Sequence, residues 1–165
     1  MSRTTAKLLI LVALGLSGCN KSSSAVPTEA QQTADVLTGD AKGDASTNPQ
    51  CKKFTVAEIG AYAGTPVNAG ENAAMGTGCQ WGARNDNGFV MVQVVEAKDH
   101  NPTTGAPGYK ELPGVGRDGF IVPDKEGGSA AAIAGDKSVN IMITTGATEA
   151  NVLAFLREAM KRSST

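Results

Sequence analysis

The chain has 165 residues, with 15 Lys and Arg against 16 Asp and Glu, so its formal net charge is −1 at pH 7. This near balance argues against a nucleic-acid partner, because binding phosphates needs a basic surface. The length allows one domain with a tail. Three Cys and one His leave little material for a metal site, and we expect no metal and no cofactor.

The N-terminus has the pattern of a secretory signal. Arg3 and Lys7 form a short cationic start, and an apolar stretch runs from Leu8 to Leu16. A stretch of this length is too short to cross a bilayer, which takes about 20 residues. The pattern therefore predicts a signal peptide over residues 1–18 rather than a transmembrane helix.

The end of this segment is more specific, because Leu16-Ser17-Gly18-Cys19 resembles the lipobox of bacterial lipoproteins. The resemblance implies that the Cys19 thiol receives a diacylglyceryl group, that the signal is cut before Cys19, and that the new amine is acylated with a chain such as palmitate. Two or more acyl chains anchor a protein stably in a membrane. The alternative is an ordinary signal peptide with a chance cysteine.

Asn20 follows the lipidated position. In Gram-negative lipoproteins an Asp at this place commonly retains the protein in the inner membrane. The resemblance therefore implies a lipid-anchored protein of the cell envelope and favours the outer membrane, facing the periplasm, if the source is Gram-negative.

Composition divides the rest of the chain in two. Residues 19–50 are rich in small and polar residues, whereas every Phe, Tyr and Trp follows residue 50. A segment with so little to bury cannot offset the entropy lost on ordering. The sequence thus predicts the lipidated Cys19 with a disordered tether over 19–50 and a single domain over 51–165.

Helices are predicted at both ends of this domain. Thr55 and Glu58 form a capping-box pattern that opens a short helix over 55–63, which Gly64 ends. Thr148 caps a C-terminal amphipathic helix, and its apolar stripe is Val152, Leu153, Leu156, Ala159 and Met160. We expect this stripe to pack on a sheet; a helix lying on a membrane is the alternative.

Between the helices, short apolar or alternating segments are separated by turn-forming residues. The strands that this pattern predicts are 79–83, 89–97, 119–122, 129–134 and 138–144, with loops over 70–78 and 98–113. The expected fold is α+β, a mainly antiparallel sheet with a short N-terminal helix and a C-terminal helix.

The cysteines left after lipidation form an even pair. Cys51 and Cys79 would lie in an oxidising compartment, which predicts a disulfide. A reactive redox pair is the alternative, but the Cys-x-x-Cys spacing is missing. Trp81 follows closely, and we expect it to pack in the core beside the disulfide, with a ligand-stacking surface as the alternative.

A family of small lipoproteins, best represented in actinobacteria and classed as a domain of unknown function, is similar to this chain in three motifs. These are Cys51-x-x-Phe54-Thr55-x-x-Glu58, Cys79-Gln80-Trp81 and Gly114-Val115-Gly116-Arg117-Asp118. The chain departs from the family pattern at Phe54, which replaces Leu, and at Arg117, which intervenes before Asp118. The resemblance implies a fold and an envelope location, and no known activity.

Few residues suggest catalysis. The segment 114–119 matches the Gly-x-Gly-x-x-Gly dinucleotide pattern, but Pro113 precedes it and a strand-like segment follows, so we interpret it as a turn. His100 is the only histidine. The serines that could join it, Ser129 and Ser138, lack the Gly-x-Ser-x-Gly context, and we expect His100 to be an exposed loop residue.

The preferred hypothesis is a non-enzymatic, lipid-anchored binding domain whose partner is an unknown protein or envelope component. Its expected contact surface is the loops 70–78 and 98–113, with His100, Tyr109 and Arg117 as candidate binding residues. An inhibitor or immunity protein against a secreted cell-wall hydrolase is one concrete form. The alternatives are a small envelope hydrolase, and a carrier of an apolar small molecule with a cavity of at least ~300 Å³.

Overall fold

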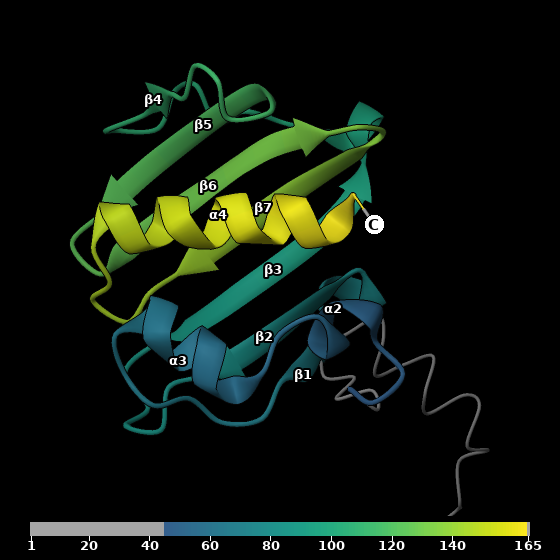
Figure 1. Cartoon of the computed structure of the whole chain (residues 1–165). Coiled ribbons are helices and arrows are strands. Elements are labelled where there is room, and N and C mark those ends of the chain that lie inside the picture. The colour runs from purple at the N-terminus through teal and green to yellow at the C-terminus, as the bar shows by residue number, and fades with distance from the viewer. Residues whose placement is uncertain (1–44, 165) are drawn as a thin grey trace, which may run out of the picture.

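The computed structural model describes residues 45–164. They form one antiparallel sheet of seven strands in the order β1-β2-β3-β7-β6-β5-β4 (Figure 1). The strands are β1 (Glu71–Ala73), β2 (Gly78–Gly82), β3 (Phe89–Glu96), β4 (Lys110–Glu111), β5 (Arg117–Asp124), β6 (Gly127–Ala134) and β7 (Lys137–Ile143). The signal peptide, Cys19 and the tether up to residue 44 lie outside the described residues.

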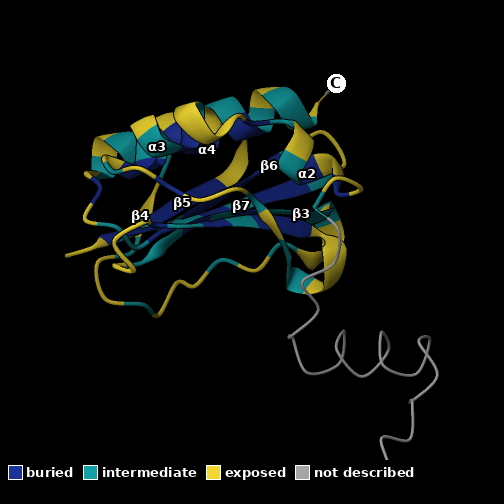
Figure 2. Ribbon diagram, turned by 90° about the horizontal axis from the view of Figure 1, so that it is seen from below, coloured by how far each residue is buried: buried dark blue, intermediate teal, exposed yellow. Residues whose placement is uncertain are grey.

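Three helices lie together on one side of the sheet, and the buried residues form the layer between them and the strands (Figure 2). They are α2 (Pro49–Lys52), α3 (Val56–Ala63) and α4 (Glu149–Ser163), and two short 3-10 turns are η1 (Ala74–Gly76) and η2 (Ala97–Asp99). The sheet with its terminal helices confirms the expected α+β fold.

The two longer helices begin where the capping patterns predict. The Thr55 side chain accepts from the Glu58 N–H while the Glu58 carboxylate accepts from the Thr55 N–H, so both halves of the capping box are present. Gly64 ends α3 with a φ of 69°, which glycine adopts without steric cost. The Thr148 hydroxyl caps α4 by accepting from the Asn151 N–H.

The core lies between α4 and the middle of the sheet. Val152, Phe155, Leu156 and Ala159 are fully buried, and α4 packs over β6 and β7. The side chains of β6 that face the helix, for example Ala130 and Ala132, are small. They therefore let α4 approach the sheet closely. Because the apolar stripe of α4 is covered by the sheet, a membrane-lying helix is the wrong interpretation of that stripe.

The disulfide joins Cys51 of α2 to Cys79 of β2, as predicted, with a Cα–Cα distance of 5.1 Å. Trp81 on the same strand is 1% exposed, and its ring lies nearly perpendicular, at 85°, to that of Phe54 at a centroid distance of 6.2 Å. Trp81 is therefore a core residue. Gly70 lies against both groups, since a Cβ there would come within 2.7 Å of the Cys79 sulfur and of the indole nitrogen.

Two boundaries differ from the sequence-based prediction. The folded part begins before Cys51: Asn48 is buried, caps α2 and donates from Nδ2 to the Gly78 carbonyl at 2.7 Å. Its amide satisfies backbone groups of the domain, a long-range role that a polar composition cannot reveal. The predicted loop 70–78 is also wrong in part, because it contains β1, an edge strand paired with β2.

The first residues of the glycine pattern at 114–119 form a turn, as predicted, and its last three belong to β5. β5 begins at Arg117, so a strand and not a helix follows the first glycines. A dinucleotide site would need a helix N-terminus at this place. Within residues 45–164, the structure contains no helix with the length and apolar character needed to span a membrane.

Candidate functional site

The long connection from β3 to β5, together with the start of β5, forms the surface that we call the loop face (residues 97–119). Its first part packs on the side of the sheet opposite the helices, whereas Val115 and Gly116 reach the helix-side core, where a Cβ at residue 116 would lie 2.7 Å from Met160 of α4. Side chains alternate along a strand, so Ser138 and Phe120 point away from the helices while their neighbours Val139 and Ile121 lie in the helix-side core. The loop face is held by contacts to these two residues.

His100 is the polar anchor of the loop face. Its Nδ1 lies 2.8 Å from the Ser138 hydroxyl, and its Nε2 lies 3.0 Å from the Asp118 carbonyl oxygen. A carbonyl only accepts, so Nε2 carries the proton, and in the neutral ring Nδ1 accepts from Ser138. The Asn140 amide donates to the same serine oxygen at 3.3 Å. Both ring nitrogens are thus used to fix the loop.

The expectation that His100 is an exposed loop residue is wrong. The ring is half-buried and bridges β7 and β5, because Ser138 projects from the face of β7 that the loop covers. The contact joins residues 38 positions apart. The alternation of β7 signals that Ser138 and Asn140 share one face, but it does not identify their partner.

Phe120 of β5 is the apolar side chain on which the loop face packs, and the sequence analysis did not single it out. Its ring centroid lies 5.6 Å from that of Tyr109, nearly parallel at 26°, and 5.8 Å from that of His100. Phe120 is buried while Tyr109 and His100 are partly exposed. Three rings within residues 100–120 are the signal that could have indicated this cluster.

A hollow of about 500 Å³ opens beside Tyr109. It is lined by Pro102, Thr104, Tyr109, Glu111, Leu112, Pro113, Gly114, Gly116, Asp118 and Gly119. Its size falls within the range of small-molecule sites. Carboxylates and a tyrosine at its walls suit it to polar groups, hydrogen-bond donors above all.

The third candidate binding residue, Arg117, stands next to this hollow. Its side chain is 66% exposed, and its Nε lies 3.8 Å from Asp118 Oδ2. An exposed pair of this kind adds little stability. The structure therefore gathers His100 and Tyr109 around Phe120, and Arg117 beside Asp118, whose carbonyl holds His100.

The strongest cluster of charges is structural and lies among the helices. Arg162 of α4 donates to Glu58 at 2.7 Å, to Glu158 at 2.7 Å and to the Lys53 carbonyl, and its guanidinium lies 4.5 Å above the Phe54 ring. The hydrogen bond from Arg162, with further bonds from Thr55, lowers the pKa of Glu58 to about 2. This cluster joins α3 to α4.

Other kinds of site find less support in the described residues. Between 45 and 164, no three His, Cys, Asp or Glu side chains are grouped closely enough to hold a metal ion. Fully buried side chains fill the interface between the sheet and the helices, the largest being Trp81, Phe155, Ile59 and Ile121. These side chains therefore leave no internal cavity for an apolar ligand at that interface.

Comparisons of the chain with protein families, curated proteins and solved structures find no match. The resemblance to small actinobacterial lipoproteins stays a prediction from three short motifs.

Proposed function

We propose that this protein is a lipid-anchored binding protein of the cell envelope, without enzymatic activity, that meets its partner through the loop face. The anchor is proposed from the cationic start, the short apolar stretch and the lipobox-like Leu16-Ser17-Gly18-Cys19. The even pair Cys51–Cys79, formed as a disulfide, suits an oxidising compartment.

The single observation that supports binding is the way the loop face is held. His100 hydrogen-bonds to β7 and β5, and Tyr109 stacks on Phe120 beside the hollow. A connection fixed in this way loses little entropy when it meets a partner. Tyr109 is an amphipathic side chain of the kind enriched at interface centres.

We propose a protein partner exported to the envelope, and inhibition of a secreted cell-wall hydrolase as the concrete form. A fixed loop that presents an aromatic side chain at the surface can contact the cleft of such an enzyme without rearranging. Rigid complexes of this type change their backbones little on association.

The experiment is affinity purification of the full chain from chemically crosslinked native envelopes, read by mass spectrometry. We expect one secreted hydrolase to be enriched with the wild type, and its activity to be inhibited by the purified protein. Tyr109→Ser should reduce the enrichment about tenfold, whereas Ala154→Ser, on the exposed side of α4, should not. Equal enrichment with both variants would contradict a partner at the loop face.

The anchor is tested in the same preparation. Cys19→Ser should leave the signal uncut and the acyl chains absent, which the mass of the N-terminal peptide reports directly. If the wild type carries no acyl chains at Cys19, the lipoprotein part of the proposal fails while the binding part stands.

A hydrolase is the second candidate, because one hydrogen bond favours it. A serine hydroxyl donating to a histidine nitrogen at 2.8 Å is the arrangement of a nucleophile with its base. However, Ser138 is 0% exposed, and the other ring nitrogen of His100 donates to a backbone carbonyl rather than a carboxylate. The variant Ser138→Ala distinguishes a hydrolase from a binding protein. If the wild type hydrolyses an aryl acetate ester and the variant does not, the hydrolase is supported.

A further inference from the structure

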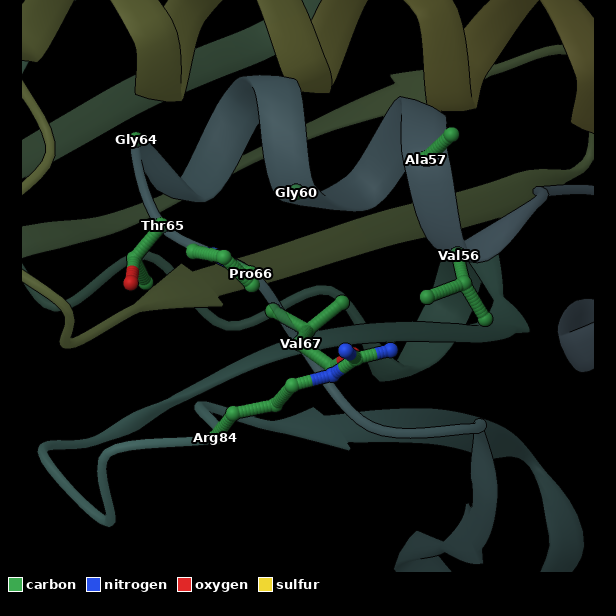
Figure 3. Close-up of a pocket in the computed structure, with 8 residues that line it drawn as sticks. All are labelled: Val56, Ala57, Gly60, Gly64, Thr65, Pro66, Val67 and Arg84. Atoms are coloured by element: carbon green, nitrogen blue, oxygen red, sulfur yellow. The ribbon is translucent and has the colours of Figure 1, made fainter.

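A groove beside α3 is lined mainly by apolar residues, and it lies on the helix side, away from the loop face. It measures about 620 Å³ and is lined by Val56, Ala57, Gly60, Gly64, Thr65, Pro66, Val67 and Arg84 (Figure 3). Val56 is exposed, and Arg84 is the one charged lining residue.

The sequence of α3 explains why this groove is apolar. Its eight residues, VAEIGAYA, contain one charged side chain, Glu58, which is engaged by Arg162. One face buries Ile59 and Ala63 in the core. The face that carries Val56 and Gly60 is apolar too. A surface helix ordinarily turns polar residues to solvent, as α4 does, so this second apolar face indicates a ligand or partner.

Gly60 shapes the floor of the groove. It sits in the helix interior, where glycine is less favourable than alanine. An added Cβ would come 3.3 Å from the Thr65 carbonyl oxygen, so the glycine lets the following segment approach α3 and leaves the floor without a side chain.

The groove offers little for a peptide backbone to pair with. Pro66 has no N–H, its carbonyl accepts from the Arg84 N–H at 3.0 Å, and the Val67 carbonyl accepts from Arg84 Nε at 3.0 Å. Val67 is also bridged to Ala83. The occupant that these walls favour is therefore a chain without polar groups along its length.

Arg84 places a positive charge at one side of this apolar groove. Its Nε is used by Val67, and its guanidinium extends toward Val56 (Figure 3). Within residues 45–164 it forms no ion pair, so its two terminal nitrogens are available. A guanidinium fork binds a carboxylate through two parallel hydrogen bonds.

We propose that the α3 groove binds a free fatty acid, with the alkyl chain along Val56, Ala57 and Gly60 and the carboxylate on Arg84. The volume is within the range of small-molecule sites. This site is separate from the loop face, so its failure would leave the proposed function untouched.

The experiment uses the full chain in lipid nanodiscs and a dodecanoic acid that carries a mid-chain diazirine and a terminal alkyne. After irradiation and reduction of the Cys51–Cys79 disulfide, trypsin releases the peptide from Phe54 to Arg84, and fragment masses locate the adduct. Mapping also separates groove adducts from labelling elsewhere in the chain. We expect saturable labelling within 56–67.

Competition defines the chemistry of the ligand. Unlabelled dodecanoate should compete about fourfold better than decanoate, because each partly buried methylene gives about a twofold gain. Dodecyltrimethylammonium, with the same chain and the opposite charge, should compete at least about tenfold less well than dodecanoate. Equal competition by the two would overturn the assignment of the carboxylate to Arg84.

Two pairs of variants keep the test specific. Ala57→Glu places a negative charge at the groove and should abolish labelling, whereas Ala61→Glu makes the same change on the exposed side of α3 outside the lining. Arg84→Gln should reduce labelling about threefold or more, whereas Arg157→Gln on α4 should not. The proposal would be overturned if Ala57→Glu or Arg84→Gln left the labelling unchanged. It would also be overturned if the nanodisc phospholipid competed more strongly than dodecanoate.

Discussion

Individual residues hold the loop face and the disulfide region in place through contacts that are specific to their size and chemistry. Cys51, Cys79 and Thr55 act through local patterns or pairing, so the sequence predicts their roles. His100 acts through Ser138, 38 residues away, and only the folded sheet brings the two together. For the same reason the candidate binding residues could be proposed from the loop, but Phe120 beneath them could not.

Gly70 tests the packing around the disulfide. A Cβ at this position would lie 2.7 Å from the Cys79 sulfur and the Trp81 indole nitrogen, so Gly70→Ala should lower the free energy of unfolding by about 1–3 kcal/mol. Gly105→Ala is the matched control, because nothing lies within 4 Å of its added Cβ. Urea denaturation of both variants measures the difference. Equal stability would show that the backbone at residue 70 shifts freely.

His100 tests how the loop face is fixed. His100→Ala removes the bonds to Ser138 and the Asp118 carbonyl, so tryptic cleavage after Lys98 and Lys110 should become about tenfold faster. Asn101→Ala, an exposed neighbour, should leave the cleavage rate unchanged. Protection that survives in His100→Ala would mean that the Tyr109–Phe120 stack alone holds the loop.

At the scale of elements, α3 and α4 are joined by one ion-pair cluster. Arg162 bonds to Glu58 and holds the pKa of that carboxyl at about 2, below its value in an unfolded chain. A lowered folded-state pKa stabilises the fold above the unfolded pKa and loses this effect as the pH falls toward the folded pKa. The link between the helices should therefore weaken between about pH 5 and pH 2.

The variant Glu58→Gln measures how much the Glu58–Arg162 pair contributes to the pH dependence of stability. We expect the urea midpoint of the variant to fall less steeply than that of the wild type between about pH 5 and pH 2. Glu126→Gln, an exposed carboxylate in the turn between β5 and β6, should follow the wild-type profile. Parallel profiles for Glu58→Gln and the wild type would contradict a role for the Arg162 pair in acid sensitivity.

The elements that the sequence predicts best are those with a strong periodic pattern or a cap. α3 begins after Thr55 and ends before Gly64, and α4 follows Thr148, as predicted. The edge strands β1 and β4 were missed, since they have three and two residues and alternation cannot be recognised over such lengths. β1 exists because β2 offers it a partner, which is tertiary information.

At the scale of the whole molecule, the disulfide joins the first turn of the folded part to the sheet. Cys51 and Cys79 are 28 residues apart, so on a chain-entropy account their bond stabilises the fold by about 3–4 kcal/mol. Cys51→Ser/Cys79→Ser should lose about this free energy of unfolding in urea. A loss below about 1 kcal/mol would show that Asn48 and the core around Trp81 hold this end without the bond.

The measurement that tests the proposed function most directly is site-specific photocrosslinking in native envelopes. The full chain carries a photoreactive phenylalanine derivative at Tyr109, in the loop face, or at Ala154, on the exposed side of α4. We expect a single protein adduct from position 109, none from position 154, and loss of the first when His100→Ala is added. No adduct from position 109, or the same adducts from both positions, would contradict a binding protein that acts through the loop face.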